Sequence, residues 1–302
     1  MMKLFKKEDG ATIVLVAIMM SVFLGLLALV VDVGNLYVEK AKIQKVVDAA
    51  ALAGAGELPL NQNQAQSMAT KTVELNKENP SDFSIFILNN ATTIEVIANK
   101  EVELFFANTL GIENPVIRAT ASVDLMPITS GVGAVPLGVE YSTSLVFGTV
   151  VKLKVADATY GNFGALALTG PGAKNYETDL LNGYNFEIEV GDILNTETGA
   201  MAGKTYTAVT NRIQSCPNQT YLNYSDDCKR LILVPVFKPI IIDSAKQVKQ
   251  VEVVGFATFF IENVTSTSNN AEVIGRFIQT TYPGSMSSTQ TNYGTYGYKL
   301  TK

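Results

Sequence analysis

Residues 11–31 read ATIVLVAIMMSVFLGLLALVV, a run without a single charged side chain. A helix rises 1.5 Å per residue, so this run spans roughly 30 Å, the thickness of the hydrocarbon core of a bilayer. In lipid the backbone has to satisfy its own hydrogen bonds, and a helix does so. The run therefore predicts a transmembrane helix over residues 11–32, preceded by a cytoplasmic segment, residues 1–10.

The charges on either side of this run predict its orientation. Lys3, Lys6 and Lys7 precede it and Asp32 follows it. An excess of lysine before the first span favours a cytoplasmic N-terminus, which would place residues 33–302 outside the membrane. The alternative is a cleaved secretory signal, but the run is long for one, and no clear small-x-small cleavage site follows it. We therefore expect a retained single-pass anchor whose first partner is the lipid bilayer.

Beyond the apolar run the pattern becomes amphipathic and remains helical. Small and apolar residues recur at helical steps, at Leu36, Ile43, Val47, Ala50 and Gly54. Charged residues lie largely between them. This spacing predicts one helix of about 45 residues, ending near Gly54, with an interaction face that needs a partner. The partner is either the chain's own ectodomain or another subunit, including a second copy of this chain.

Three stretches of this region carry a family resemblance. They are Asp9-Gly10-Ala11, then the stretch Val31 to Tyr37 (VDVGNLY), then Gln44 to Ala55 (QKVVDAAALAGA). Together they resemble the N-terminal region of Tad (tight adherence) pilus-assembly proteins of the TadE/TadG type. The Ala- and Gly-rich end of the third stretch adds specificity, because membrane insertion does not demand it.

The resemblance implies a single-pass, pilin-like protein of a bacterial envelope, a minor pilin or assembly component of Flp-type pili. Its implied partners are other proteins of the pilus or secretion apparatus. Prepilin members of the family are cut after a glycine that a glutamate follows five residues later. The corresponding site here is Gly10–Ala11, and Leu15 stands at the glutamate position. We therefore expect this bond to be cut inefficiently or not at all.

The rest of the chain predicts an α+β fold in which strands dominate the second half. A helix-compatible stretch, strand pairs and turn residues suggest a small module that packs on the outer half of the long helix. Val102–Leu110 is predicted as a short helix, and Thr129–Ala134 as a linker. The expected order is a pilin-like module over 33–126, a β-rich extracytoplasmic domain over 135–281 and a flexible Ser/Thr/Tyr/Gly tail over 282–302.

Composition excludes much familiar chemistry. The chain has no histidine, which removes Ser-His-Asp catalysis and every His-containing metal site. Its net charge of −5 argues against nucleic-acid binding, which needs a basic stripe. Residues 199–205 (GAMAGKT) resemble a phosphate-binding loop, but one residue is missing between the glycines. We therefore predict no catalytic residues, no cofactor and no metal site.

The two cysteines of the chain, Cys216 and Cys228, flank a short polar loop. Outside the cytoplasm two cysteines this close are expected to form a disulfide. Free thiols and an intermolecular bridge are the alternatives. The spacing is too wide for the Cys-x-x-Cys arrangement of redox enzymes, so the predicted role is structural.

Three functions follow in order of preference. The first is a membrane-anchored, pilin-like structural or assembly protein of a Tad/Flp-type surface pilus. The second is a surface adhesin or ligand-binding envelope protein without a filament, because the strand-rich half is larger than assembly alone requires. The third is an extracytoplasmic glycan hydrolase that would use carboxylates, since histidine is absent.

Overall fold

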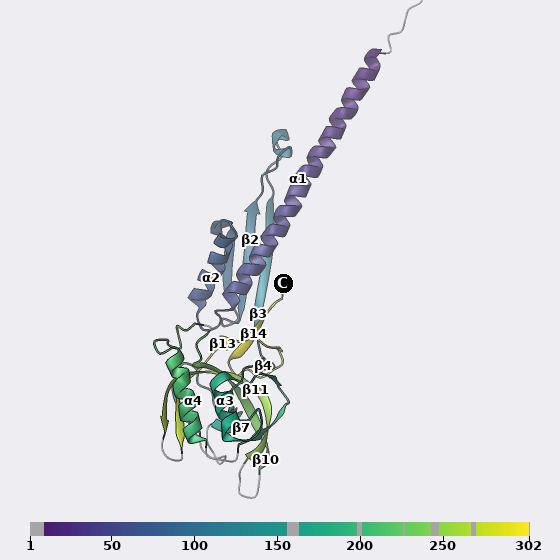
Figure 1. Ribbon diagram of the computed structural model, residues 1–302. Coiled ribbons are helices and arrows are strands. Elements are labelled where there is room, and N and C mark those ends of the chain that lie inside the picture. The colour runs from purple at the N-terminus through teal and green to yellow at the C-terminus, as the bar shows by residue number, and fades with distance from the viewer. Residues whose placement is uncertain are drawn as a thin grey trace, which may run out of the picture.

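The computed structural model describes residues 9–155, 163–197, 201–225, 227–242, 248–266 and 270–301. The fold is α+β. Helix α1 projects at one end, a small α/β unit lies beside its C-terminal half, and a β-rich unit forms the other end (Figure 1).

Helix α1 runs without interruption from Asp9 to Ala55. This confirms the prediction of a single helix that continues from the apolar run into the amphipathic segment. Strong helix formers at residues 49–53 support its last turns, and a glycine follows at residue 56.

The α/β unit is built on the C-terminal half of α1. Its elements are α2 (Gln62–Leu75), the 3-10 turn η1 (Pro80–Asp82), and the antiparallel strands β1 (Phe83–Leu88), β2 (Thr93–Glu101) and β3 (Val116–Pro127). Along β2 and β3 buried and less buried residues alternate, as expected for a sheet with one covered face. The buried residues of these strands join those of α1 and α2 in one core.

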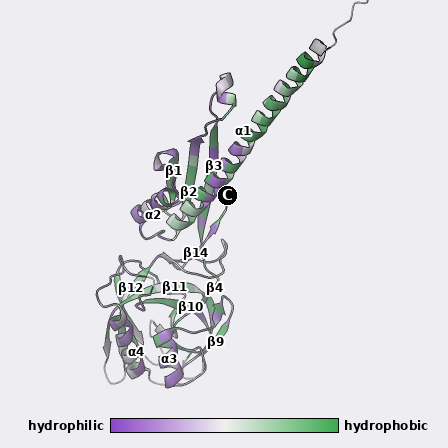
Figure 2. Ribbon diagram, turned by 45° about the horizontal axis from the view of Figure 1, so that its top comes forward, coloured by the Kyte–Doolittle hydropathy of each residue, from purple (hydrophilic) through white to green (hydrophobic). Residues whose placement is uncertain are grey.

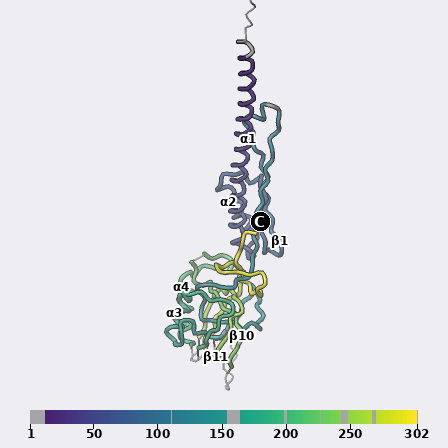
Figure 3. The backbone as a smooth tube through the Cα atoms, turned by 90° about the vertical axis from the view of Figure 1, so that its right-hand side faces the viewer, coloured from purple at the N-terminus to yellow at the C-terminus, as the bar shows by residue number. Residues whose placement is uncertain are grey.

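The predicted helix over Val102–Leu110 is wrong for most of its length. Only Ala107–Leu110 is helical, as the 3-10 turn η2, and residues 102–106 lie outside any helix. Val102 and Leu104 are both buried, which gives the stretch the alternation of extended chain. The resulting loop extends β2 and β3 alongside α1, toward its N-terminal half (Figures 1 and 3).

The predicted flexible tail also has to be corrected. Residues 295–300 form strand β14, which pairs antiparallel with β3 and parallel with β13 (Thr280–Thr281). The sheet order is therefore β1-β2-β3-β14-β13. Tyr296 is buried in the α/β core, and the hydroxyl groups of Thr295 and Thr258 bond to each other at 2.8 Å. Some buried positions of this strand carry polar side chains that pair with other polar groups. The strand therefore lacks the apolar alternation from which a buried strand is predicted.

The β-rich unit is a sheet whose hydrogen bonding returns on itself. In the residues described, the strand order is β10-β5-β7-β6-β12-β11-β9, and β10 also pairs with β11. This last pairing closes a barrel-like ring, in which β9 bridges β7 and β11. The strands are β5 (Leu137–Glu140), β6 (Val150–Val155), β7 (Phe163–Ala167), β9 (Ile193–Thr196), β10 (Leu231–Ile242), β11 (Val248–Ser266) and β12 (Ala271–Ile278).

Two helices and a small strand pair complete this unit. Helices α3 (Ala173–Asn182) and α4 (Ala202–Ser215) contribute Tyr176, Leu180 and Val209 to its core. Strand β4 (Ser130–Val132) pairs with β8 (Glu187–Glu189). The predicted linker over Thr129–Ala134 thus contains a paired strand, and Ser130 and Ala134 are buried. Its glycines permit close packing: a Cβ at Gly131 would come within 2.7 Å of Leu233.

Candidate functional site

The N-terminal half of α1 is covered by no other described part of the chain. Its side chains from Thr12 to Val31 are nearly all exposed, and its most apolar stretch of 18 residues has a mean hydropathy of 3.0. Figure 2 shows this half as a hydrophobic ribbon that stands clear of the remaining fold. Within the described residues it is the one helix long and apolar enough to cross a membrane. Gly10 and Ala11, the candidate processing site, lie in its first turn.

Asp32 ends the apolar run and connects α1 to the loop between β2 and β3. Its side chain is only 4 % exposed. One carboxylate oxygen accepts hydrogen bonds from the backbone N–H groups of Phe105 (2.8 Å) and Phe106 (3.2 Å). The other accepts from Phe106 (3.2 Å) and Ala107 (2.8 Å). The carboxylate therefore satisfies the free N–H groups at the start of η2, which have no partner within that turn.

The predicted interaction face of α1 packs against the chain's own α/β unit. Ile43, Val47 and Ala50 are fully buried in the core shared with α2, β2 and β3. Gly54 is buried as well, and Leu36 is half-buried nearer the membrane half. Of the two partners left open by the sequence, these side chains contact the rest of their own chain.

The opposite face of α1 has no cover from the described chain. Val33, Tyr37 and Val38 are exposed, and Tyr37 is 78 % exposed. Ala41 continues this exposed face, and exposed Lys45 interrupts its apolar character before Leu52. The outward face follows directly on the apolar half, so apolar surface continues along one side of the helix as far as Ala41.

A group of charged side chains fastens α1 to the α/β unit. The carboxylate of Glu78, which follows α2, lies 2.6 Å from Lys42 of α1 and 2.8 Å from Lys100 of β2. Lys100 also pairs with Glu39 of α1 at 3.0 Å. The Glu78 side chain is almost fully buried, so losing its partners would leave an uncompensated charge.

Comparison with known protein families gives a match for the N-terminal region. Residues 10–57 match the family described as putative Flp pilus-assembly TadE/G-like, or Tad. We call residues 10–57, which are similar to this family, the Tad segment. The match covers α1 almost completely and ends in the turn after it, leaving the sheets outside. The curated proteins and the solved structures gave no match.

At Gly54, near the end of the Tad segment, the packing leaves no room for a side chain. A Cβ at Gly54 would collide with Ile94 and would lie 2.9 Å from the carbonyl oxygen of Ala65. We expect Gly54→Ala to lower the free energy of unfolding by about 2 kcal/mol, because a well-packed core resists added volume. Thermal unfolding of the detergent-solubilised chain measures this. The matched control is Gly34→Ala, since a Cβ there meets nothing within 4 Å and should add about 1 kcal/mol of helix stability. Equal effects at both positions would contradict the close packing.

The charge group predicts a specific pH dependence. Burial by itself would raise the pKa of Glu78, but hydrogen bonds and charge from Lys100 and Lys42 outweigh it and lower this pKa below 4.5. The stabilisation is therefore complete above that ordinary value and lost as the pH falls through the folded pKa. For Lys100, the same bonds outweigh burial and raise the pKa, so its contribution is complete below 10.5 and lost as the pH rises through the folded pKa.

We expect Glu78→Gln to cost about 2 kcal/mol at neutral pH and to flatten the acid limb of the stability profile. Urea unfolding at a series of pH values measures both effects. Exposed Glu74, on α2, provides the control variant Glu74→Gln. An acid limb in Glu78→Gln as steep as that of the control would show that another carboxylate is responsible.

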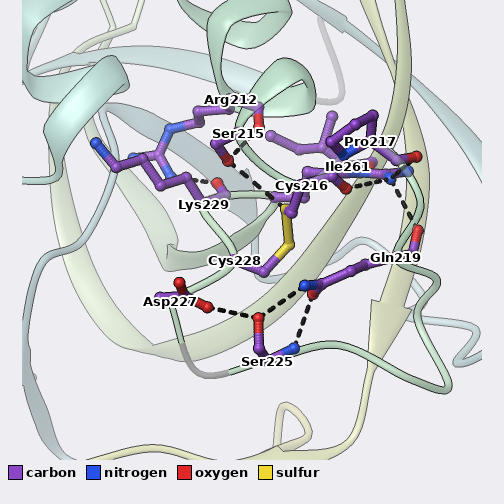
Figure 4. Close-up of a disulfide and its surroundings, with 11 residues drawn as sticks. Arg212, Ser215, Cys216, Pro217, Gln219, Ser225, Asp227, Cys228, Lys229 and Ile261 are labelled. Carbon is purple, nitrogen blue, oxygen red and sulfur yellow. Dashed lines mark hydrogen bonds between the residues drawn. A yellow bond between two sulfur atoms is a disulfide. The ribbon is translucent and has the colours of Figure 1, made fainter.

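The predicted disulfide is confirmed. Cys216 and Cys228 are bonded, with their Cα atoms 5.6 Å apart. Both are buried beside Phe260 and Ile278 of the β-rich unit. Within the loop, Gln219 and Ser225 exchange two hydrogen bonds of 2.7 Å (Figure 4).

Arg230 holds the start of this disulfide loop through hydrogen bonds. Its guanidinium donates to the carbonyl oxygens of Gln219 (2.8 Å) and Cys216 (3.2 Å), and to that of Ile261 on β11 (2.7 Å). The same group lies 4.6 Å from the centre of the Phe260 ring. The loop is therefore fixed to β11 by a cation as well as closed by the disulfide.

The phosphate-loop-like stretch takes part in internal contacts. Gly199 and Ala200 lie outside the described residues. Lys204 pairs with Glu177 at 2.6 Å, and the buried Thr205 hydroxyl bonds to Tyr176 and to the Met201 carbonyl. Among the described residues, no three side chains of the His, Cys, Asp and Glu types lie close enough together to hold a metal ion.

A cleft of about 1570 Å³ lies where the two units meet. It is lined by the turn after α1, by the 222–224 loop and by Tyr282 and Tyr298. Thr281 bonds across this junction to the carbonyl oxygen of Gly56 at 3.0 Å.

Sequence reasoning found α1 and the disulfide but assigned no role to Asp32, Glu78 or Lys100. The signal at Asp32 was a carboxylate immediately after an apolar run. Its partners lie more than 70 positions away, in a loop that the sequence predicts as helix. No local pattern identifies such a pair.

Proposed function

We propose that this protein is a single-pass, membrane-anchored structural or assembly component of a bacterial Tad/Flp-type surface pilus. The observation that carries the proposal is the coincidence of the Tad match, residues 10–57, with α1. That helix leaves its apolar half uncovered and packs its other half on a folded unit. A helix of this design anchors an ectodomain and also offers a surface for assembly.

The proposed orientation has the N-terminus in the cytoplasm and residues 33–302 outside. The lysines at positions 3, 6 and 7 support it through the preference of positive charge for the cytoplasmic side. The Cys216–Cys228 disulfide supports it because such bonds persist outside the reducing cytoplasm. An epitope placed after Lys302 should be accessible to protease in protoplasts. Protection of that epitope until the membrane is opened would reverse the proposed topology.

The outward face of α1 is the proposed contact with another pilus or secretion protein, or with a second copy of this chain. Tyr37 is the most exposed aromatic residue on that face. A photo-crosslinking amino acid at Tyr37 should form an adduct with such a protein in intact cells. The matched control is the same amino acid at Phe186, which is comparably exposed on the β-rich unit. No adduct at Tyr37, or the same adducts at both positions, would argue against an assembly role for this face.

The Gly10–Ala11 bond remains the proposed processing site, and we expect it to stay largely uncut because Leu15 replaces glutamate. The intact mass of the protein from its native membrane tests this. A mature chain that starts at Ala11 throughout would contradict the expectation and favour incorporation into a filament.

A surface adhesin without a filament partner is the second candidate, and the cleft between the two units is the observation that favours it. The two functions differ in what co-purifies after mild cross-linking. Recovery of pilus or secretion proteins supports assembly. Their absence, together with a bound ligand that Tyr298→Ala releases, would support the adhesin.

A further inference from the structure

The loop between β2 and β3 presents a group of exposed apolar side chains beside the anchor. Phe105 is 63 % exposed, Phe106 48 % and Ile112 52 %. They lie around η2, which ends at Gly111 in the left-handed conformation. We call residues 104–114 the hairpin tip. Single exposed apolar residues are ordinary, but three on one short loop mark an interaction surface.

The position of the hairpin tip is fixed by Asp32. This residue follows directly on the apolar run, so it marks the level at which α1 leaves the hydrocarbon core. The N–H groups of Phe105, Phe106 and Ala107 all bond to its carboxylate. Asn35, one turn further along, reaches the carbonyl oxygen of Glu103 at 3.4 Å. The backbone of the tip is therefore held at the boundary between membrane and water.

Within the described part of the chain, Phe105, Phe106 and Ile112 remain exposed. Val102 and Leu104 are buried, so their side chains lie on the side of the loop that faces the protein. Extended backbone sends the next side chain to the opposite face, which places Phe105 outward. The views of Figures 1 and 3 agree that the loop stands beside α1 and reaches toward its apolar half.

We propose that the hairpin tip inserts into the headgroup region of the same bilayer that α1 crosses. Apolar side chains such as Phe and Leu are suited to shallow insertion of roughly 5–10 Å, which is typical of interfacial elements. The exposed carboxylates of Glu103 and Glu113 lie at the two ends of the loop, remain in water and limit its depth. They also favour a zwitterionic surface over an anionic one.

The tip gives the protein a second attachment point. A single helix leaves the ectodomain free to tilt and rotate, whereas a helix and a tip linked through Asp32 fix its orientation on the membrane. The inference rests on the proposed anchoring, because without α1 in the bilayer the tip has no surface beside it.

The test uses the full chain in phosphatidylcholine vesicles, with an environment-sensitive fluorophore on a single introduced cysteine. The native cysteines are paired and stay unlabelled without reductant. Phe106→Cys reports on the tip, Phe186→Cys on the exposed β-rich unit and Phe23→Cys on the anchor. Lipids with a spin label near the headgroup or near the chain ends reveal depth, and iodide reveals contact with water.

We expect the Phe106 label to be quenched by the shallow spin label and to resist iodide several-fold better than the Phe186 label. The Phe23 label should be quenched by the deep spin label. Deep quenching at Phe23 with a water-exposed Phe106 label would overturn the tip proposal alone. A Phe23 label that no spin-labelled lipid quenches would overturn the anchoring and the tip together.

Shielding of the Phe106 label by a second copy of the chain is the remaining outcome, and it also overturns the proposal. It would disappear when the protein is diluted in excess lipid, whereas shielding by lipid would not. A second label site, Ile112→Cys, guards against a local disturbance at Phe106. The two positions should give the same depth.

Discussion

Alanine in place of Asp32 is expected to release the hairpin tip from α1. The carboxylate accepts four hydrogen bonds from three backbone N–H groups in a site that is almost closed to solvent. Bonds to a charged acceptor are stronger than neutral ones, and buried donors left without a partner are costly. We therefore expect these three amides to exchange roughly 100-fold faster in the variant.

Hydrogen exchange of the Phe105, Phe106 and Ala107 amides measures this effect in detergent or lipid. Asp32→Asn should fall between wild type and alanine, because one of its two side-chain groups is a donor and cannot accept from N–H. Asn35→Ala is the matched control on the same helix face, where a single long contact of 3.4 Å is lost. Unchanged protection of the three amides in Asp32→Ala would show that β2 and β3 hold the tip without α1.

Removing the disulfide should produce a second large effect in a different part of the molecule. The bond joins residues 12 positions apart, and closing a loop of that size contributes about 3 kcal/mol by the chain-entropy argument. We expect the double variant Cys216→Ala/Cys228→Ala to lose about that much from the β-rich unit. Alanine is preferred to serine because both sites are buried, and serine would add hydroxyl groups to bury.

Thermal unfolding followed by circular dichroism measures this loss, and fractionation of the membrane measures insertion. Insertion should not change, because α1 depends on lipid and on its own backbone bonds. Reduction of the wild-type disulfide should reproduce the destabilisation of the double variant. A double variant as stable as the wild type would mean that Arg230 and the Gln219–Ser225 bonds hold the loop by themselves.

These two predictions concern parts of the protein whose stability depends on different interactions. The Tad segment combines an uncovered apolar half with a helix face that packs on the α/β unit. The bonds of Asp32 and the charge group at Glu78 hold that unit against α1. The proposed surface for other proteins is then the exposed outward face around Tyr37. The sheets lie outside residues 10–57, the part of the chain that is similar to the Tad family.

The sequence by itself determined the features that depend on local order along the chain. An uncharged run of membrane length has to be helical in lipid, and its continuation at helical spacing extends the same helix to Ala55. The two cysteines on either side of a short polar loop predicted the disulfide between them. The predominance of strands in the second half also followed from composition, because β-branched and aromatic residues favour strands.

Only the tertiary structure decided which distant segments meet. The sequence predicted a tail at residues 282–302, but β14 returns to pair with β3 of the first unit. It predicted a helix at Val102–Leu110, where Asp32 instead captures the N–H groups of an extended loop. Pairing between strands, and between a carboxylate and remote amides, satisfies backbone groups across long stretches of chain. The choice among such partners depends on the whole fold, and for that reason no local pattern of residues encodes it.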